Sequence, residues 1–202
     1  IHILDIVPDL PLPYFTVHEE NPALGWRGIR FCLDNVSILV TQLRAMLRAS
    51  ASAGNLKIIV PMVSTIAELR EFHAVLDDTI GQLHREGVQV ARPEVGIMVE
   101  VPAAISQLAK WKGYIEFISI GSNDLSQYLT AVDRNNPRVA SKYDHLHPAV
   151  LAEIARVVEA AGRLKLPVSV CGEMASDPEA VVMLIGMGIR KISMSATQLP
   201  KM

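Results

Sequence analysis

The sequence contains little cysteine, few aromatic residues and no long apolar run. Only two of its 202 residues are cysteine and 5% are aromatic. Cys32 and Cys171 lie in different surroundings and lack metal-site spacing, which argues against a disulfide framework and a cysteine metal site. The longest apolar runs are about strand length, far short of the roughly 20 residues of a membrane helix.

The charge pattern is equally unremarkable. Charged residues make up 20% of the chain and the net charge is −2. No basic excess indicates a nucleic-acid partner, and no block of like charge indicates a disordered tail. We therefore expect a reduced, cytoplasmic protein that binds neither nucleic acid nor membrane.

Half of the residues are hydrophobic, which is enough for one sizeable core. The beginning, IHILDIV, lacks the charged lead and cleavage-like tail of a signal peptide. It reads as a strand already in progress, so we expect residues 1–202 to be one domain taken from a longer protein.

Short apolar runs alternate with helical patterns along the chain. Residues 7–22 hold four prolines and are expected to form a long loop. Alternation of this kind predicts a parallel sheet with helices outside it. An eight-unit barrel takes about 250 residues, so six units suit an open sheet or a barrel that lacks its first two units. The expected strands are 1–6, 56–63, 95–99, 117–121, 166–170 and 191–194. The clearest helices are 36–49, a helix from residue 66 to a stop at Gly87, 149–163 and 178–186.

Two helix starts have specific signals. Thr65 and Glu68 have the spacing of a capping box, in which each side chain bonds the other residue's backbone N–H. Asp177 and Pro178 form an N-cap and first-turn pair.

Polar side chains follow several predicted strands. In FISIGSNDLSQY (117–128), Asp124 could hold a divalent cation and Asn123 could donate to a substrate oxygen, although an ordinary helix cap would use the same residues. Glu100 ends the preceding strand, where no helix requires its charge. Two hard carboxylates suit Mg²⁺, with substrate phosphate and water completing its shell. Salt bridges to Arg27 and Arg134 are an equally good interpretation.

Cys171 lies between VSV and GEM at a strand end. A buried cysteine is usually a small hydrophobic residue, but beside polar groups its thiol can donate or accept a proton. Cys32, within IRFCLDN, fits the core interpretation.

Four segments occur in the order typical of one family: EENPALGWRGIR (19–30), VGIMVEVPAA (95–104), FISIGSNDLSQYLTAVDRNN (117–136) and CGEMASD (171–177). They closely resemble the phosphoenolpyruvate-binding domain of Enzyme I, the phosphoenolpyruvate–protein phosphotransferase of the bacterial phosphotransferase system. The segment LGWRGIR resembles the corresponding sequence of the nitrogen-related branch. The resemblance implies a (βα)₈ TIM barrel, of which these strands would be the third to the eighth.

The resemblance also implies site roles. Glu100 and Asp124 match Mg²⁺ ligands, and Cys171 matches the acid that protonates C3 of the enolate as pyruvate leaves. The groups that hold the phosphate and carboxylate of phosphoenolpyruvate are matched by Asn123, Arg134 and Arg27, with Asp124 included among the substrate-binding residues. The implied partners are phosphoenolpyruvate, pyruvate, a histidine phosphocarrier protein and a second copy of the chain.

This chain departs from the family pattern near its start. His2 replaces a phosphoenolpyruvate-binding arginine, Leu10 replaces a lysine, and Val7-Pro8 replaces two glycines. These changes should weaken anion binding and stiffen the loop. The chain also lacks the first two strands and the phosphohistidine part, so we expect no complete turnover from it. The alternative function is a degenerate or truncated barrel kept for dimerisation or regulation, and a lyase on a similar barrel is a weaker possibility.

Overall fold

The structure, a computed structural model, describes residues 1–5 and 19–201. The chain divides into two compact units, unit 1 (residues 1–96) and unit 2 (residues 97–202). Their boundary falls within strand β2 (Glu94–Val99). The strands follow one another in the sheet in the order β1-β2-β3-β4-β5.

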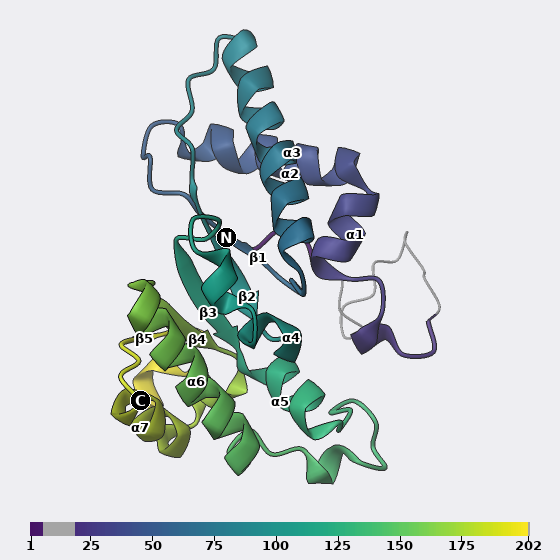
Figure 1. Cartoon of the computed structure of the whole chain (residues 1–202), viewed down its shortest axis with the longest axis vertical. Helices are drawn as coiled ribbons and strands as arrows, with labels where there is room; N and C mark the ends of the chain where they lie inside the picture. The colour runs from purple at the N-terminus through teal and green to yellow at the C-terminus, as the bar shows by residue number, and fades with distance from the viewer. Residues whose placement is uncertain (6–18, 202) are drawn as a thin grey trace. The chain divides into compact units, whose positions relative to one another are not determined.

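Unit 1 is mainly helical (Figure 1). Helix α2 packs against α3, and α1 packs against both. The core of the unit is formed by the apolar sides of these helices, with Leu39, Leu43, Leu69 and Leu76 fully buried. Its elements are the short helix η1 (Pro22–Leu24), α1 (Gly28–Asp34), α2 (Val36–Ser50), β1 (Lys57–Val60) and α3 (Ile66–Arg85).

Unit 2 alternates strands and helices. β3 pairs in parallel with β4, and β4 with β5. α5 packs against α6. Its elements after β2 are α4 (Pro102–Ile105), η2 (Leu108–Trp111), β3 (Phe117–Gly121), α5 (Ser122–Thr130), η3 (Ala140–Lys142), α6 (Pro148–Leu164), β4 (Val168–Cys171), η4 (Glu173–Ser176), α7 (Pro178–Gly186), β5 (Lys191–Ile192) and η5 (Leu199–Lys201).

The predicted α/β class with a parallel sheet is confirmed, and within the described residues the sheet is open. The alternation of elements fits an incomplete barrel. The predicted capping box is present, since Glu68 N donates to Thr65 Oγ1 and Thr65 N donates to the Glu68 carboxylate. Asp177 caps α7 as predicted, and Pro178 is its first residue.

Three sequence expectations need correction. The first predicted strand is only an isolated parallel bridge between His2 and Ile59, and its sixth residue lies outside the described residues. β1 stops at Val60, because Pro61 has no N–H to donate to a neighbouring strand. Helix α1 was not predicted, because Arg27 at its N-cap makes no side-chain cap bond and Gly28 has a left-handed φ of 56°.

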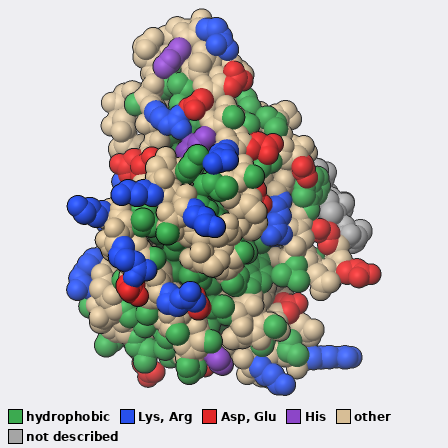
Figure 2. Space-filling view, in the orientation of Figure 1, with side chains coloured by type: hydrophobic (Ala, Val, Ile, Leu, Met, Phe, Trp, Pro, Cys, Tyr) green, Lys and Arg blue, Asp and Glu red, His purple; other side chains and the backbone are tan. Residues whose placement is uncertain are grey.

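Two surface features bear on function classes. No helix in the described parts of the chain is both long and apolar enough to span a membrane. On the face in Figure 2, acidic and basic side chains are interspersed with apolar ones.

The predicted loop of residues 7–22 lies mostly outside the described residues, including Val7, Pro8 and Leu10.

Candidate functional site

The carboxyl ends of β2, β3 and β4 in unit 2 carry the predicted site residues. Glu100 follows β2 directly, Asn123 and Asp124 follow β3, and Cys171 is the last residue of β4. Gly121 is opposite Cys171 in the register of β3 and β4. Parallel strands present these ends at one edge, which is where ligands bind in such sheets.

The two predicted metal ligands are both buried. Glu100 is 3% exposed and Asp124 is 8% exposed. The Glu100 carboxylate lies against the backbone of β3, since a Cβ added to Gly121 would be 2.7 Å from Glu100 Oε2. Glycine is therefore required at position 121 for this carboxylate to approach the strand. A larger residue there would displace either the carboxylate or the strand.

The Cys171 thiol has three close neighbours. Its Sγ lies 3.4 Å from the Ile120 carbonyl oxygen and 3.5 Å from Met98 Sδ. Ser119 donates to it from Oγ at 3.8 Å. The thiol is thus held by groups on β2 and β3 rather than by its own strand.

Burial raises the pKa of the Cys171 thiol above its ordinary value. The hydrogen bond from Ser119 lowers this pKa, and the negative charges of Glu100 and Asp124 raise it. Cys171 is consequently protonated at neutral pH, which is the state that a proton donor needs. An influence of both carboxylates on the thiol is expected for groups at the carboxyl ends of neighbouring strands.

Asn123 links the ends of β3 and β4. Its Oδ1 accepts a hydrogen bond of 2.8 Å from Glu173 N. Ser122, which is fully buried, donates from Oγ to the Cys171 carbonyl oxygen at 2.7 Å. Gly172, which lies between Cys171 and Glu173, has φ 96°, and a Cβ added to it would be 2.4 Å from Ser122 Oγ. With Oδ1 fixed in this way, the amide Nδ2 of Asn123 is oriented as a donor.

Arg134 lies in the loop after α5. Its backbone N donates to Gln127 Oε1 at 3.0 Å. Burial is the largest influence on the pKa of Tyr143 and raises it, whereas the positive charge of Arg134 acts to lower it. The charge of Asp124 also acts on Tyr143, whose hydroxyl donates to the Asn123 carbonyl oxygen at 3.4 Å. Tyr143 is therefore a site neighbour that sequence reasoning missed, because no motif in KYDHLHP marks it.

Arg27 belongs to unit 1. It is 3% exposed and binds Asp5 through two contacts, from Nε to Oδ1 at 3.0 Å and from Nη2 to Oδ2 at 2.6 Å. The planar two-point geometry of the Arg27–Asp5 pair fixes the orientation of the guanidinium.

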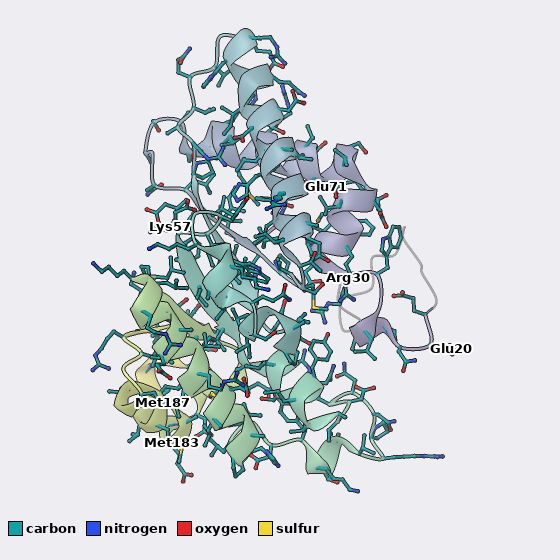
Figure 3. The ribbon with its side chains drawn as sticks, viewed as in Figure 1. Glu20, Arg30, Lys57, Glu71, Met183 and Met187 are labelled. Carbon is teal, nitrogen blue, oxygen red and sulfur yellow. The ribbon has the colours of Figure 1, made fainter. Side chains whose placement is uncertain are left out.

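Further hydrogen bonds shape the backbone around Arg27. Glu19 accepts a hydrogen bond from Trp26 N at 3.0 Å, and Ile29 N donates to the Pro61 carbonyl oxygen at 3.2 Å. Arg30, labelled in Figure 3, donates to the carbonyl oxygens of Leu24 and Gly25. The segment LGWRGIR thus has a defined turn before α1.

Mg²⁺ fits the donor chemistry of Glu100 and Asp124. Two buried carboxylates are hard oxygen donors, and Mg²⁺ is commonly held by one or two carboxylates together with water and substrate phosphate. Within the described residues, no group of three or more His, Cys, Asp or Glu side chains could hold a metal by itself. A cation held by Glu100 and Asp124 would take its remaining ligands from other oxygen donors, such as water and substrate phosphate.

Comparison with known proteins places these residues in a wider context. All 202 residues match the family described as PEP-utilising enzyme, PEP-binding domain. A Salmonella typhimurium protein named phosphoenolpyruvate-dependent phosphotransferase system is 46% identical over 196 residues, covering 96% of this chain and 26% of that protein. A Geobacillus stearothermophilus phosphoenolpyruvate-protein phosphotransferase is 47% identical over 201 residues, covering 98% of this chain and 35% of that protein.

The chain thus spans about a quarter to a third of the length of these curated relatives. Among solved structures, an HpcH/HpaI aldolase from Desulfitobacterium hafniense has a TM-score of 0.51 at 13% identity, covering 86% of this chain and 83% of that one. A member of the aldolase/citrate lyase family from Burkholderia cenocepacia has a TM-score of 0.53 at 14% identity, covering 86% and 76%. At these identities the likeness concerns the fold alone.

Proposed function

Because the chain belongs to the family of PEP-utilising enzymes, as their PEP-binding domain, we propose that it binds phosphoenolpyruvate with Mg²⁺ for phosphoryl transfer. In the parent protein the phosphoryl group would pass to a histidine and then to a histidine phosphocarrier protein, releasing pyruvate. The observation that supports this most strongly is the convergence of Glu100, Asp124 and Cys171 at adjacent strand ends.

Glu100 and Asp124 are the proposed Mg²⁺ ligands. When bound, the cation would neutralise charge on the phosphate and on the enolate oxygen. Burial suits the two carboxylates to this role, because a buried negative charge is stable only when it is paired or coordinated. Glu100 directly follows β2, and Asp124 lies in the first turn of α5 after β3, so each carboxylate is positioned by its own strand end.

Cys171 is the proposed proton donor. When the P–O bond to the enol oxygen breaks, the pyruvate enolate must gain a proton at C3 to become pyruvate. The S–H bond supplies that proton, so C3 becomes a methyl group and the thiol becomes a thiolate. The Ser119 hydroxyl donates to Sγ and stabilises the thiolate.

Anion binding is assigned to Asn123, Arg134 and Arg27. The oriented amide of Asn123 and the guanidinium of Arg134 can donate to phosphate or carboxylate oxygens. Arg27 is preorganised by Asp5 within unit 1. With His2 and Leu10 in place of an arginine and a lysine, we expect weaker binding than a full set of cations would give.

The remaining expectations concern the parent protein. We propose that the parent protein is a cytoplasmic homodimer formed through this domain. From the motif LGWRGIR, we also propose that it belongs to the nitrogen-related branch. The relatives support the phosphotransferase setting through their names.

Calorimetric titration of the folded chain with phosphoenolpyruvate tests the proposal directly. We expect heat of binding in the presence of Mg²⁺ and at least tenfold weaker binding without it. Glu100→Gln and Asp124→Asn should each weaken binding by about tenfold or more, since metal binding loses a charged ligand.

Glu94→Gln is the matched control, because Glu94 begins the strand that Glu100 follows and forms an exposed ion pair with Lys57. It should leave binding unchanged. A folded chain that gives no heat with phosphoenolpyruvate and Mg²⁺ would contradict the proposal and favour the non-catalytic barrel instead.

A further inference from the structure

The loop between α5 and α6 (residues 131–147) carries Arg134 and Tyr143. Its only regular element within the described residues is the short helix η3. Asp133 accepts a hydrogen bond from Asn135 N, and Asp144 accepts one from Leu146 N, both at 2.8 Å. These local turns shape the loop, but they cannot set its distance from the strand ends.

A side-chain pair ties the far end of this loop to the segment after β4. His145 Nε2 and Asp177 Oδ2 are 2.8 Å apart, and the two side chains are 22% and 27% exposed. Because an ionised carboxylate can only accept, His145 must carry the hydrogen on Nε2. The hydrogen bond from His145 is the largest influence lowering the pKa of Asp177.

Asp177 is itself firmly placed. Its other oxygen, Oδ1, accepts from Glu179 N at 3.0 Å and so caps α7. Asp177 lies six residues after Cys171, at the end of η4, and Glu173 in η4 is bonded to Asn123. The carboxylate is thus a fixed point on the same segment that carries the proposed proton donor.

The two ends of the loop are held differently. Near its start, Arg134 N donates to Gln127 on the preceding helix. Near its end, His145 contacts Asp177 on the segment after β4. Tyr143, only two residues before His145, donates to the Asn123 carbonyl oxygen at the longer distance of 3.4 Å. The His145–Asp177 pair is the shorter of these two links between the loop and the site.

We propose that His145 and Asp177 are positioning residues that hold the loop so that Arg134 meets the phosphate of the bound substrate. This inference rests on the proposed function. The pair contributes to binding of the phosphorylated substrate and not to proton transfer, because the hydrogen bonds of the Cys171 thiol in the described residues go to Ser119, Met98 and Ile120 and not to this pair. The chemical group that Arg134 would recognise in this position is a phosphate monoester.

Two substitutions break the pair while sparing other roles. His145→Ala removes the donor. Asp177→Ser removes the charged acceptor but keeps a good N-cap for α7. Each should weaken phosphoenolpyruvate binding, measured by calorimetry with Mg²⁺, by about threefold to fivefold, as expected for a partly exposed pair. His145→Gln keeps an N–H donor and should restore most of the affinity.

His147→Asn is the matched control, since His147 lies in the same loop but only caps α6, through a bond from Ala149 N. It should leave affinity unchanged. A second readout is amide hydrogen exchange, which should accelerate in residues 131–147 of His145→Ala and Asp177→Ser but not within α6. A third readout is the Mg²⁺-dependent exchange of the pyruvate methyl hydrogens with solvent. Its rate at saturating pyruvate should be the same in His145→Ala and Asp177→Ser as in the unmodified chain.

The outcomes separate this inference from the proposed function. If the unmodified chain binds phosphoenolpyruvate and both variants bind it equally well, the positioning role is wrong and the proposed function stands. Unchanged amide exchange in the loop of both variants would also overturn it. If the unmodified chain does not bind phosphoenolpyruvate, both proposals are wrong.

Discussion

Units 1 and 2 each contain a thiol close to acidic groups, but they surround it differently. Cys32 in unit 1 is fully buried, and its Sγ donates to the Leu4 carbonyl oxygen at 3.3 Å. Burial and, secondarily, the charge of Asp5 raise its pKa to about 12. Cys171 in unit 2 lies at a strand end and accepts a hydrogen bond from Ser119.

The comparison shows what makes a thiol chemically useful. Both thiols are protonated at neutral pH, but in the described structure a hydroxyl donates only to Cys171, where it can stabilise a thiolate. Unit 1 uses its polar groups to hold structure, as the Asp5–Arg27 pair illustrates. Unit 2 gathers carboxylates, an amide and a thiol at the carboxyl ends of its strands.

The largest expected effect concerns the ion pair of unit 1. Asp5→Asn should lower the free energy of unfolding by about 3–5 kcal/mol, because it removes the charged partner of a buried arginine. Urea unfolding followed by helix content measures this change. Glu94→Gln, which breaks an exposed pair in the same unit, should cost no more than about 1 kcal/mol. Equal losses would show that Asp5 does not hold Arg27 in place.

A smaller effect is expected at two of the glycines with a positive φ, Gly172 in unit 2 and Gly87 in unit 1. Gly172→Ala should destabilise the protein by about 2–3 kcal/mol, through backbone strain and contact with Ser122 and Asn123. Gly87 has φ 81° but no atom within 4 Å of an added Cβ, so Gly87→Ala should cost only about 1 kcal/mol.

Calorimetric titration distinguishes the two variants further, because only Gly172→Ala should also weaken phosphoenolpyruvate binding. A Gly172→Ala variant with normal stability and normal binding would show that the turn after β4 does not depend on this glycine.

The last prediction, and the smallest change when it is counted per pH unit, is a pH dependence caused by Cys32. Its pKa is raised from 9.0 to about 12 in the folded protein. The stabilisation is therefore complete below about pH 9, and it is lost as pH rises towards 12, because the unfolded chain ionises first. The slope should be about 1.4 kcal/mol per pH unit.

Urea unfolding between these pH values, in a Cys171→Ala background, measures the slope. Cys32→Ala should flatten it, since no thiol then remains. An unchanged slope in that variant would assign the alkaline instability to other groups.

Much of the fold could be predicted from local signals. The capping box at Thr65 and the Asp177-Pro178 start mark α3 and α7 because they depend only on neighbouring residues. Apolar runs located the strands for the same reason. Helix α1 could not be predicted, because its start relies on a glycine in a left-handed conformation and on a bond from Ile29 N to Pro61, far along the chain.

The site could be predicted only in part. The strand ends indicated Glu100, Asp124 and Cys171, and the family resemblance gave their roles, which remain proposals. Ser119, Tyr143 and the partners of Asn123 and Arg27 became visible only in the structure. Their contacts join residues between 20 and 52 positions apart, and no local pattern encodes such pairings.

The most direct test of the account is exchange of the pyruvate methyl hydrogens in deuterium oxide with Mg²⁺, followed by NMR. Protonation of the enolate at C3 is the reverse of proton removal from this methyl group, so the group that does one must do the other. The account predicts exchange by the unmodified chain and by Cys32→Ala, and a loss of about 100-fold or more in Cys171→Ala. Equal exchange by the unmodified chain and Cys171→Ala would contradict the assignment of Cys171 as the proton donor.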